Sequence, residues 1–294
     1  MHAAPTRLAR RRGDLRSEDQ LREHYVIERE LADRLREASR AERRVLYSLV
    51  YAELLQRVPH HPLRTSARDA AYVADRQRET ERVLRFLERF ISLRTRFLEV
   101  GAGDCTLALK VSDLAEHVVA VDVCDQVCGA ERPCNFALVL SDGCSIPVPA
   151  GSIDVAFSNQ MMEHLHPEDA REQLVNIFRS LAPGGTYVCI TPNRLYGPRD
   201  VSGYFDPIAT GLHLREYSAR EIREMLLAVG FERVDFYIGA RGWYARCPGW
   251  AVSSLETLLE ALPAGVRKQV ADTALVRAFL GVRVAATKAG EATQ

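Results

Sequence analysis

The chain has no long hydrophobic run, very little lysine and no net charge. Hydrophobic residues make up 47% of its 294 positions, yet no apolar stretch approaches the roughly 18 residues that a membrane-spanning helix needs. The arginine-rich residues 10–12 lead into polar sequence instead of the apolar core of a signal peptide. Because 39 basic residues balance 39 acidic ones, no overall field attracts nucleic acid or an anionic membrane. We therefore expect a cytoplasmic protein with no membrane span and no nucleic-acid partner.

The cysteines lack the pattern of a disulfide framework. There are seven, an odd number, and they are scattered through expected strands and loops. Cys124, Cys128, Cys134 and Cys144 do fall in one short region, where four thiolates could hold zinc. Their spacing is irregular, so we favour ordinary buried thiols and expect no metal there.

The most informative stretch is a glycine loop that follows an apolar strand. Residues 97–105 read Phe-Leu-Glu-Val-Gly-Ala-Gly-Asp-Cys, and Gly101 and Gly103 allow the backbone to fold tightly against a ligand. The helix expected next offers unpaired backbone N–H groups. A second apolar run, residues 118–121, ends in Asp122, roughly 20 residues beyond the loop, where a βαβ unit places a ribose-binding acid. The pattern predicts a nucleoside-binding turn.

One glycine that dinucleotide binding requires is missing from this loop. In the pattern G-x-G-x-x-G counted from Gly101, the sixth position is Thr106. In addition, Glu99 would lie close to a bound pyrophosphate and repel it, whereas a cationic ligand would tolerate this carboxylate. A nicotinamide-dependent oxidoreductase is therefore the weakest of the alternatives.

These residues resemble the first motif of the class I S-adenosylmethionine-dependent methyltransferases, an acid followed by G-x-G-x-G. The resemblance continues in order over about residues 80–288. Its further segments are Ser141-Asp142-Gly143, residues 153–159, Glu163-His164-Leu165, residues 181–185 and Thr191-Pro192-Asn193. One position departs from the motif, because Cys105 stands where the family has its third loop glycine.

The resemblance implies S-adenosyl-L-methionine as cofactor and S-adenosyl-L-homocysteine as product. It implies that the methionine part lies near Glu99 and the glycine loop, that Asp122 holds the ribose hydroxyls and that Asp142 binds the adenine amino group. The cofactor-binding residues implied in this way are Glu99, Gly101, Gly103, Asp122, Asp142, Gly143 and Asn159. A methyl sulfonium is already activated, so the enzyme mainly has to align the acceptor and exclude water.

The alternation of strands and helices from residue 97 onward predicts an α/β fold with a mostly parallel sheet wound on both faces. The expected strands are residues 97–100, 118–123, 137–140, 153–158, 186–191, 233–239 and 282–286, and the expected helices are 104–115, 167–181, 218–229 and 250–279. The resemblance implies a Rossmann-like, seven-stranded sheet of order 3-2-1-4-5-7-6 with the last strand antiparallel.

Three helices are expected before the glycine loop, over about residues 18–37, 39–57 and 67–91. Ser39 and Glu42 form a capping box at the start of the second. The expected organisation is a disordered tail over residues 1–17, a helical lid or homodimer segment over 18–91, the cofactor-binding domain over 92–288 and a second tail over 289–294.

Residues 192–217 form a segment too long for a simple connection. Long loops at the carboxyl ends of parallel strands often carry function. The candidate acceptor-binding residues in it are Arg194, Tyr196, Arg199, Tyr204, Arg215 and Tyr217, although each arginine could equally form a loop-stabilising ion pair.

Two histidines are candidates for a general base that takes a proton from a hydroxyl acceptor. His213 and His164 are chosen because histidine is the side chain best matched to neutral pH. In some resembled quinone O-methyltransferases the Glu-His pair helps to bind a divalent metal, but Gln160 replaces the acid that this subgroup usually has, and we expect no metal. His166, beside Pro167, is expected to begin the following helix.

Together these patterns predict a methyltransferase that acts on a small-molecule acceptor, most simply at a hydroxyl oxygen. A nucleic-acid amino-methyltransferase is disfavoured, because residues 158–161 read Ser-Asn-Gln-Met and lack an Asn/Asp-Pro-Pro-Tyr signature. The different-class alternative is a catalytically idle cofactor-binding or structural subunit. The preference for arginine over lysine suggests a GC-rich bacterial genome, in which a secondary-metabolite or glycolipid substrate would be unsurprising.

Overall fold

The computed structural model describes residues 14, 16–65, 70–125, 132–240 and 242–291. Within these residues the core is one eight-stranded sheet of order β3-β2-β1-β4-β5-β8-β6-β7. The strands are β1 (Arg96–Val100), β2 (His117–Asp122), β3 (Phe136–Leu140), β4 (Ile153–Asn159), β5 (Leu181–Thr191), β6 (Arg233–Ala240), β7 (Trp243–Cys247) and β8 (Val282–Thr287). Strands β1 to β5 pair in parallel, and β8 inserts antiparallel between β5 and β6.

The prediction of an α/β fold with a mostly parallel sheet is confirmed, and the prediction of seven strands is wrong by one. β7 is an additional edge strand that forms an antiparallel hairpin with β6. Gly242 in the connecting turn has φ of +86°, a backbone conformation that favours glycine. Without β7, the observed order is β3-β2-β1-β4-β5-β8-β6. This is the implied order 3-2-1-4-5-7-6, with β8 as the seventh strand.

The helices fill the connections between strands. They are α1 (Glu18–Glu37), α2 (Arg40–Arg57), α3 (Pro62–Thr65), α4 (Ala70–Leu87), α5 (Thr106–Val111), α6 (Pro167–Ser180), α7 (Ala219–Val229), α8 (Gly249–Glu260), α9 (Ala264–Ala271) and α10 (Ala274–Leu280), with 3₁₀ turns at Met162–His164 and Val201–Tyr204. The predicted capping box of α2 is present, and His166 is the N-cap of α6 as predicted. None of the helices in the described residues is long and apolar enough to cross a membrane.

Two helical predictions need correction. The helix expected over residues 104–115 is limited to α5, which begins after Cys105 in the left-handed conformation. The helix expected over residues 250–279 is broken into α8, α9 and α10. Pro263 precedes α9 and interrupts the helical hydrogen bonding, because proline has no N–H to donate.

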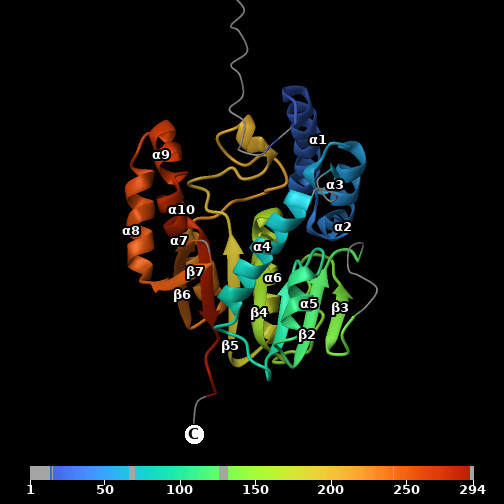
Figure 1. The fold of residues 1–294 in the computed structure, drawn as a ribbon, viewed down its shortest axis with the longest axis vertical. Helices are drawn as coiled ribbons and strands as arrows, with labels where there is room; N and C mark the ends of the chain where they lie inside the picture. The colour runs from blue at the N-terminus through green and yellow to red at the C-terminus, as the bar shows by residue number, and fades with distance from the viewer. Residues whose placement is uncertain (1–13, 15, 66–69, 126–131, 241, 292–294) are drawn as a thin grey trace, which may run out of the picture.

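Alternating side chains of the parallel strands build two apolar layers. Leu98 and Val100 point to the layer that contains α2, α6 and α7, whereas Phe97 points to the layer that contains α4 and α5. Figure 1 shows helices on both sides of the sheet, with α8 to α10 gathered beside its β6–β7 edge. The period-two alternation of a buried strand thus explains why both faces are covered.

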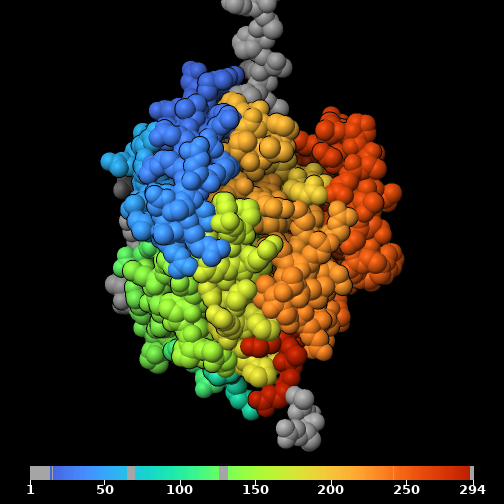
Figure 2. Space-filling view, turned by 180° about the vertical axis from the view of Figure 1, so that it is seen from behind, coloured from blue at the N-terminus to red at the C-terminus, as the bar shows by residue number. Residues whose placement is uncertain are grey.

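The N-terminal helices lie beyond the carboxyl ends of the strands. In Figure 1, α1, α2 and α3 lie at the same end of the sheet as the segment that follows β5. Figure 2 shows from behind that α1 and that segment form adjoining surface. A buried ion pair attaches α2 to α6: Arg43 Nε lies 2.5 Å from Asp169 Oδ2, and Tyr47 donates to the same carboxylate at 2.7 Å. The carboxyl ends of the strands are therefore covered by the N-terminal helices.

Candidate functional site

A cavity of about 350 Å³ lies at the carboxyl ends of β1, β2 and β4. Its size falls in the usual range for small-molecule sites, about 300–1,000 Å³. Four of the predicted cofactor residues and one predicted base line it: Gly101, Gly103, Asp122, Gly143 and His164. The opposite wall comes from α2 and includes Tyr47 and Tyr51.

The glycine loop has the backbone conformation that its sequence predicts. Gly101 and Gly103 have φ of +74° and +53°. A Cβ atom on Gly101 would lie 2.6 Å from the side chain of Met161, whereas a Cβ on Gly103 would meet nothing within 4 Å. Cys105 adopts φ of +57°, so it takes up the left-handed conformation that glycine would otherwise provide. Replacement of the third glycine therefore leaves the turn left-handed at that position.

Asp122 closes the loop from the end of β2. Its Oδ2 accepts a hydrogen bond from Gly103 N at 2.7 Å, and its Oδ1 accepts one from Val123 N at 2.7 Å. The carboxylate has further lone pairs and lines the cavity, so it can also accept from ribose hydroxyls.

Glu99 is buried on β1, and one of its carboxylate oxygens, Oε2, has no hydrogen-bond partner. Burial raises the pKa of this carboxyl group to about 8, with the nearby Asp104 and Asp122 charges acting in the same direction. It does not line the cavity in this conformation. An unpartnered buried oxygen is a group that a cationic ligand would satisfy, so its chemistry fits the predicted role.

The remaining predicted cofactor residues lie beside the cavity. Gly143 has φ of +87°, and a Cβ there would lie 2.9 Å from the ring of Tyr47. Asp142 accepts from Cys144 N and Ser145 N, and it pairs with Arg44 at 2.7 Å. Neither Asp142 nor Asn159 is among the lining residues. Their contacts with the cofactor stay predictions.

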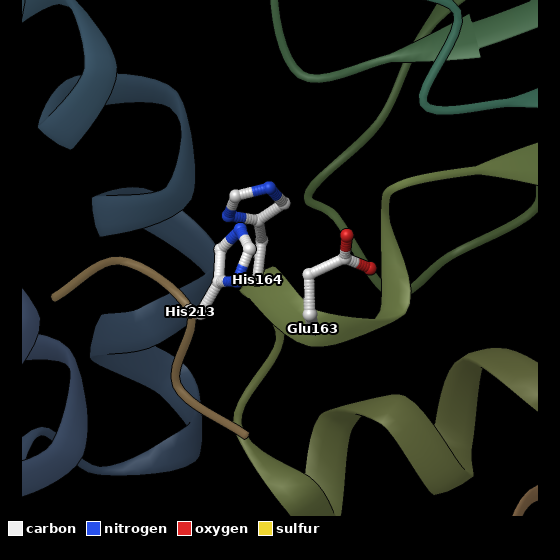
Figure 3. A group of neighbouring side chains, drawn as sticks. All are labelled: Glu163, His164 and His213. Carbon is white, nitrogen blue, oxygen red and sulfur yellow. The ribbon is translucent and has the colours of Figure 1, made fainter. Parts of the chain in front are cut away.

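A second cavity, of about 380 Å³, adjoins the first. Tyr51, Leu63, His164 and Leu212 line both. Its other walls come mainly from α1 and from the segment after β5, and that segment contributes three predicted residues: Arg199, Tyr204 and His213. The two predicted bases therefore both line the second cavity, and Figure 3 shows their rings side by side, next to Glu163.

His164 is half-buried and neutral. Burial lowers the pKa of its imidazole to about 3, and the neighbouring His213 acts in the same direction. Its Nδ1 lies 3.0 Å from the carbonyl oxygen of Leu212 and 2.7 Å from the hydroxyl of Tyr51. Since a carbonyl oxygen can only accept, we assign the ring proton to Nδ1, which leaves Nε2 as an acceptor.

His213 has the opposite electrostatic environment. Burial alone would lower the pKa of His213, but a hydrogen bond from its Nδ1 to Glu216 Oε1 at 2.7 Å, together with Glu163 and Asp200, raises it above its usual value. The centres of the His164 and His213 rings are 4.8 Å apart. The site thus places one neutral imidazole beside one more basic imidazole.

Glu163 lies next to this pair on the 3₁₀ turn after β4. It is buried, its Oε2 accepts from the Thr191 hydroxyl at 2.9 Å, and burial raises the pKa of its carboxyl group to about 7. One ligand atom from each of Glu163, His164 and His213 lies within 4.8 Å of the others, a separation that could suit a metal ion. The expectation that the protein needs no metal stays a prediction.

Sequence reasoning missed two residues that hold the histidines. Glu216 follows His213 at a spacing of three residues, a local signal that could have been recognised. Tyr51 reaches His164 from α2 across a separation of 113 residues, for which the sequence offers no signal. The N-terminal helices therefore contribute directly to the candidate site.

The other predicted acceptor-binding residues line neither cavity. They are Arg194, Tyr196, Arg215 and Tyr217. Arg194 pairs with Glu221 at 3.2 Å, and Arg215 pairs with Glu221 at 2.9 Å. The arginine contacts agree with the alternative of loop-stabilising ion pairs, and a role for any of the four residues in acceptor binding is untested.

The cysteines of the suggested zinc cluster are partly outside the described residues, because Cys128 falls there. Of the others, Cys144 is buried and Cys134 is exposed. The described residues near Cys144 that could share a metal with it are Asp169 and Glu172 and include no second cysteine. Asp169 is already paired with Arg43, as described above.

Taken together, a Rossmann-like sheet, a glycine loop after β1 and an acid at the end of β2 define a nucleoside-binding domain of the class I methyltransferase type. The residues present fit S-adenosylmethionine: the glycine loop has open space at Gly103, Asp122 has free acceptor capacity and Glu99 has an unpartnered oxygen.

Comparison with known proteins agrees with this class. Residues 98–189 match a family model described as a methyltransferase domain. Over 141 residues the chain is 32% identical to a protein of Mycolicibacterium smegmatis named "Probable S-adenosylmethionine-dependent methyltransferase", which covers 47% of this chain and 52% of that protein. A protein of Mycobacterium tuberculosis that carries the same descriptive name is 30% identical over 138 residues, 46% of this chain and 47% of that protein. Residues 98–189 therefore match a methyltransferase domain, and the relatives that the chain resembles over about half its length are named as S-adenosylmethionine-dependent.

The match to these relatives is partial. The chain spans about half the length of the curated relatives it matches. Among solved structures, a chain from the complex between the Haloferax volcanii Trm112 methyltransferase activator and a methyltransferase aligns with a TM-score of 0.51 and 16% identity, over 78% of this chain and 96% of that chain. At this level of identity the likeness supports the fold alone.

Proposed function

We propose that the protein transfers a methyl group from S-adenosylmethionine to a small-molecule acceptor, at a hydroxyl oxygen. The observation that carries the proposal is the pair of adjoining cavities, one lined by the glycine loop and Asp122, the other by His213. His164 lies in the wall between them. This arrangement suits a reaction between two separately bound molecules.

The chemistry assigns different tasks to the two histidines. A bound S-adenosylmethionine supplies a methyl group that is already activated by its sulfonium. His164, with Nδ1 held by the Leu212 carbonyl, accepts a hydrogen bond at Nε2 from a neighbouring hydroxyl of the acceptor and thereby orients the molecule. His213, with Nδ1–H donated to Glu216, takes the hydroxyl proton at Nε2 as the acceptor oxygen forms its bond to the methyl carbon. The bond from that carbon to sulfur would break at the same time, and the donor would leave as neutral S-adenosylhomocysteine.

Two measurements test this proposal. Calorimetry is expected to detect S-adenosylhomocysteine binding to the wild-type protein. A screen of hydroxyl-bearing small molecules with labelled S-adenosylmethionine is expected to find transfer to oxygen. Binding without transfer to any acceptor would favour the catalytically idle subunit, and transfer only to nitrogen or carbon would contradict the choice of oxygen.

The proposal also includes the setting in which the protein works. We place it in the cytoplasm of a bacterium, in secondary metabolism, with a homodimer contact through the N-terminal helices as a further possibility to be tested by sedimentation. The mycobacterial relatives support the bacterial setting. Chelation of divalent metals is expected to leave transfer unchanged.

A further inference from the structure

The second cavity is surrounded by charged side chains from three segments of the chain. They are Asp14 and Arg16 before α1, His24 and Glu28 on α1, and Arg199, Asp200 and His213 after β5. A cavity lined in this way could select its ligand by charge. The contacts that these groups make with one another indicate whether the cavity suits an anionic, a cationic or an uncharged ligand.

Arg16 is already engaged by its neighbours. Its Nε and Nη2 lie 2.9 Å and 2.6 Å from the two carboxylate oxygens of Asp14, in a bidentate arrangement. Its Nη1 lies 2.5 Å from Nδ1 of His24. Asp14 also accepts a hydrogen bond from the Tyr204 hydroxyl at 2.7 Å. This arginine is therefore neutralised where it faces the cavity.

The two acids deeper in the cavity have hydrogen-bond donors beside them. Glu28 lies 2.7 Å from Nε2 of His24, and its Oε1 accepts from Leu212 N at 3.0 Å. Asp200 accepts from the backbone N–H of His213 at 3.2 Å and from Ser202. Arg199 lies 3.7 Å from Asp272. Each described charge of the wall thus has a partner of opposite sign or a hydrogen-bond donor.

Charged side chains that already have partners favour an uncharged, hydroxyl-bearing ligand over an anion or a cation. Anion sites usually present a guanidinium fork or ammonium whose donors are aimed at the ligand, and Arg16 already uses three of its nitrogens on Asp14 and His24. A cation would lie close to the more basic His213, which lines the same cavity. Hydroxyl groups both donate and accept, so they can use the spare lone pairs of Glu28 and Asp200 and the donors beside them without unbalancing any pair.

Building on the proposed function, we propose that the second cavity binds an uncharged acceptor that bears several hydroxyl groups. The acceptor extends from the histidine pair toward Glu28 and Arg16. One hydroxyl donates to His213 and a neighbouring one donates to His164, and the others exchange hydrogen bonds with the charged groups of the wall.

A matched set of three probes tests the charge selection. A hexose, the corresponding hexosamine and the corresponding hexose phosphate share one scaffold and differ in charge. Saturation-transfer NMR on the protein with S-adenosylhomocysteine is expected to show the hexose binding at least about tenfold more tightly than either charged probe. Equal or tighter binding of a charged probe, or no binding of the hexose, would overturn the inference. Calorimetry of S-adenosylhomocysteine on the same sample reports on the proposed function separately.

Two variants locate the binding. Val201 is buried and lines the second cavity but not the first, so Val201→Phe is expected to reduce hexose binding by more than about tenfold while S-adenosylhomocysteine binding persists. Ile208→Phe is the matched control, because Ile208 is 69% exposed and lines neither cavity. If Val201→Phe also loses S-adenosylhomocysteine binding, the substitution has disturbed the fold, and Glu28→Gln, which preserves the shape of the side chain, is used in its place. Hexose binding that is unchanged in whichever of the two variants retains S-adenosylhomocysteine binding would contradict the assignment of the second cavity.

Discussion

At the scale of the residue, two neighbouring histidines differ in chemistry because of their partners. His164 is held neutral by burial and by the neighbouring His213, whereas the hydrogen bond to Glu216 raises the pKa of His213. A general base has to lose its proton before it can accept one from the substrate. The rate of methyl transfer is therefore expected to rise with pH through the pKa of His213, above its ordinary value near 6.5.

Glu216→Gln tests this dependence. The amide still accepts the Nδ1 hydrogen bond but no longer stabilises the imidazolium, so the pKa of His213 is expected to fall. NMR titration of the histidine C2 protons measures the pKa directly, and the rising limb of the rate profile should move to lower pH with it. If the pKa of His213 did not change, Glu216 would not be the residue that raises it.

Glu99 gives a prediction about stability. Its pKa is about 8 in the folded protein and 4.5 ordinarily, so the native state keeps a proton that the unfolded chain loses between these values. Stability linked to Glu99 is thus present at low pH and is lost as pH rises from about 4.5 to about 8. Glu99→Gln is expected to raise the melting temperature at pH 9 by at least about 3 °C and leave it unchanged at pH 5.

Glu116→Gln is the control for that comparison, because Glu116 is exposed and has no burial cost to remove. Thermal unfolding followed by circular dichroism at both values of pH suffices. If Glu99→Gln lowered stability at pH 9, the buried carboxylate would have a partner that the described contacts do not include.

At the scale of the element, helix α2 is held to α6 by a buried charge. The Arg43 side chain is 4% exposed and Asp169 is fully buried. Arg43→Ala would leave the carboxylate of Asp169 without its guanidinium partner, and we expect a loss of about 3–5 kcal/mol in the free energy of unfolding. Arg40→Ala is the matched control: Arg40 lies 4.0 Å from the same carboxylate but is 55% exposed, so its loss should be within about 1 kcal/mol. Urea unfolding measures both, and equal effects would contradict this account.

Elements with a buried face were predictable from sequence, and those without one were not. β1 and β2 are almost wholly buried, so they read as apolar runs. β7 was missed because, of its residues, only Cys247 is buried, which leaves no apolar face to recognise. The capping box of α2 was recognised because Ser39 and Glu42 are local in sequence.

In the candidate site, contacts between residues close in sequence could be predicted, whereas contacts between distant segments could not. The glycine loop and Asp122 belong to one βαβ unit, so their spacing places both at the first cavity. The ion pair of Asp142 with Arg44 joins positions 98 residues apart. No motif records such a contact, because it depends on how α2 packs against the sheet.

At the scale of the whole molecule, the N-terminal helices and the sheet share one core. Leu31 of α1, Val50 of α2, Leu98 of β1 and Leu174 of α6 belong to a single buried cluster. We therefore expect the N-terminal helices and the sheet to unfold together rather than in separate steps. Trp243 and Trp250 lie near the opposite, β7 edge, and their fluorescence reports on that region.

A comparison of probes tests this cooperativity. Tryptophan fluorescence and far-ultraviolet circular dichroism are expected to give the same urea midpoint. A circular-dichroism transition at lower urea than the fluorescence transition would mean that part of the helical structure melts before the sheet edge. The N-terminal helices would then act as a separable lid.

The central claim is that Asp122 holds the ribose of a bound S-adenosyl nucleoside. The most direct test is calorimetry of S-adenosylhomocysteine with the wild type, with Asp122→Ala and with Asp113→Ala, whose carboxylate is exposed after α5. Loss of the ribose hydrogen bonds is expected to weaken binding by more than about tenfold in Asp122→Ala alone. Wild-type affinity in Asp122→Ala, or no binding by the wild-type protein, would contradict the account.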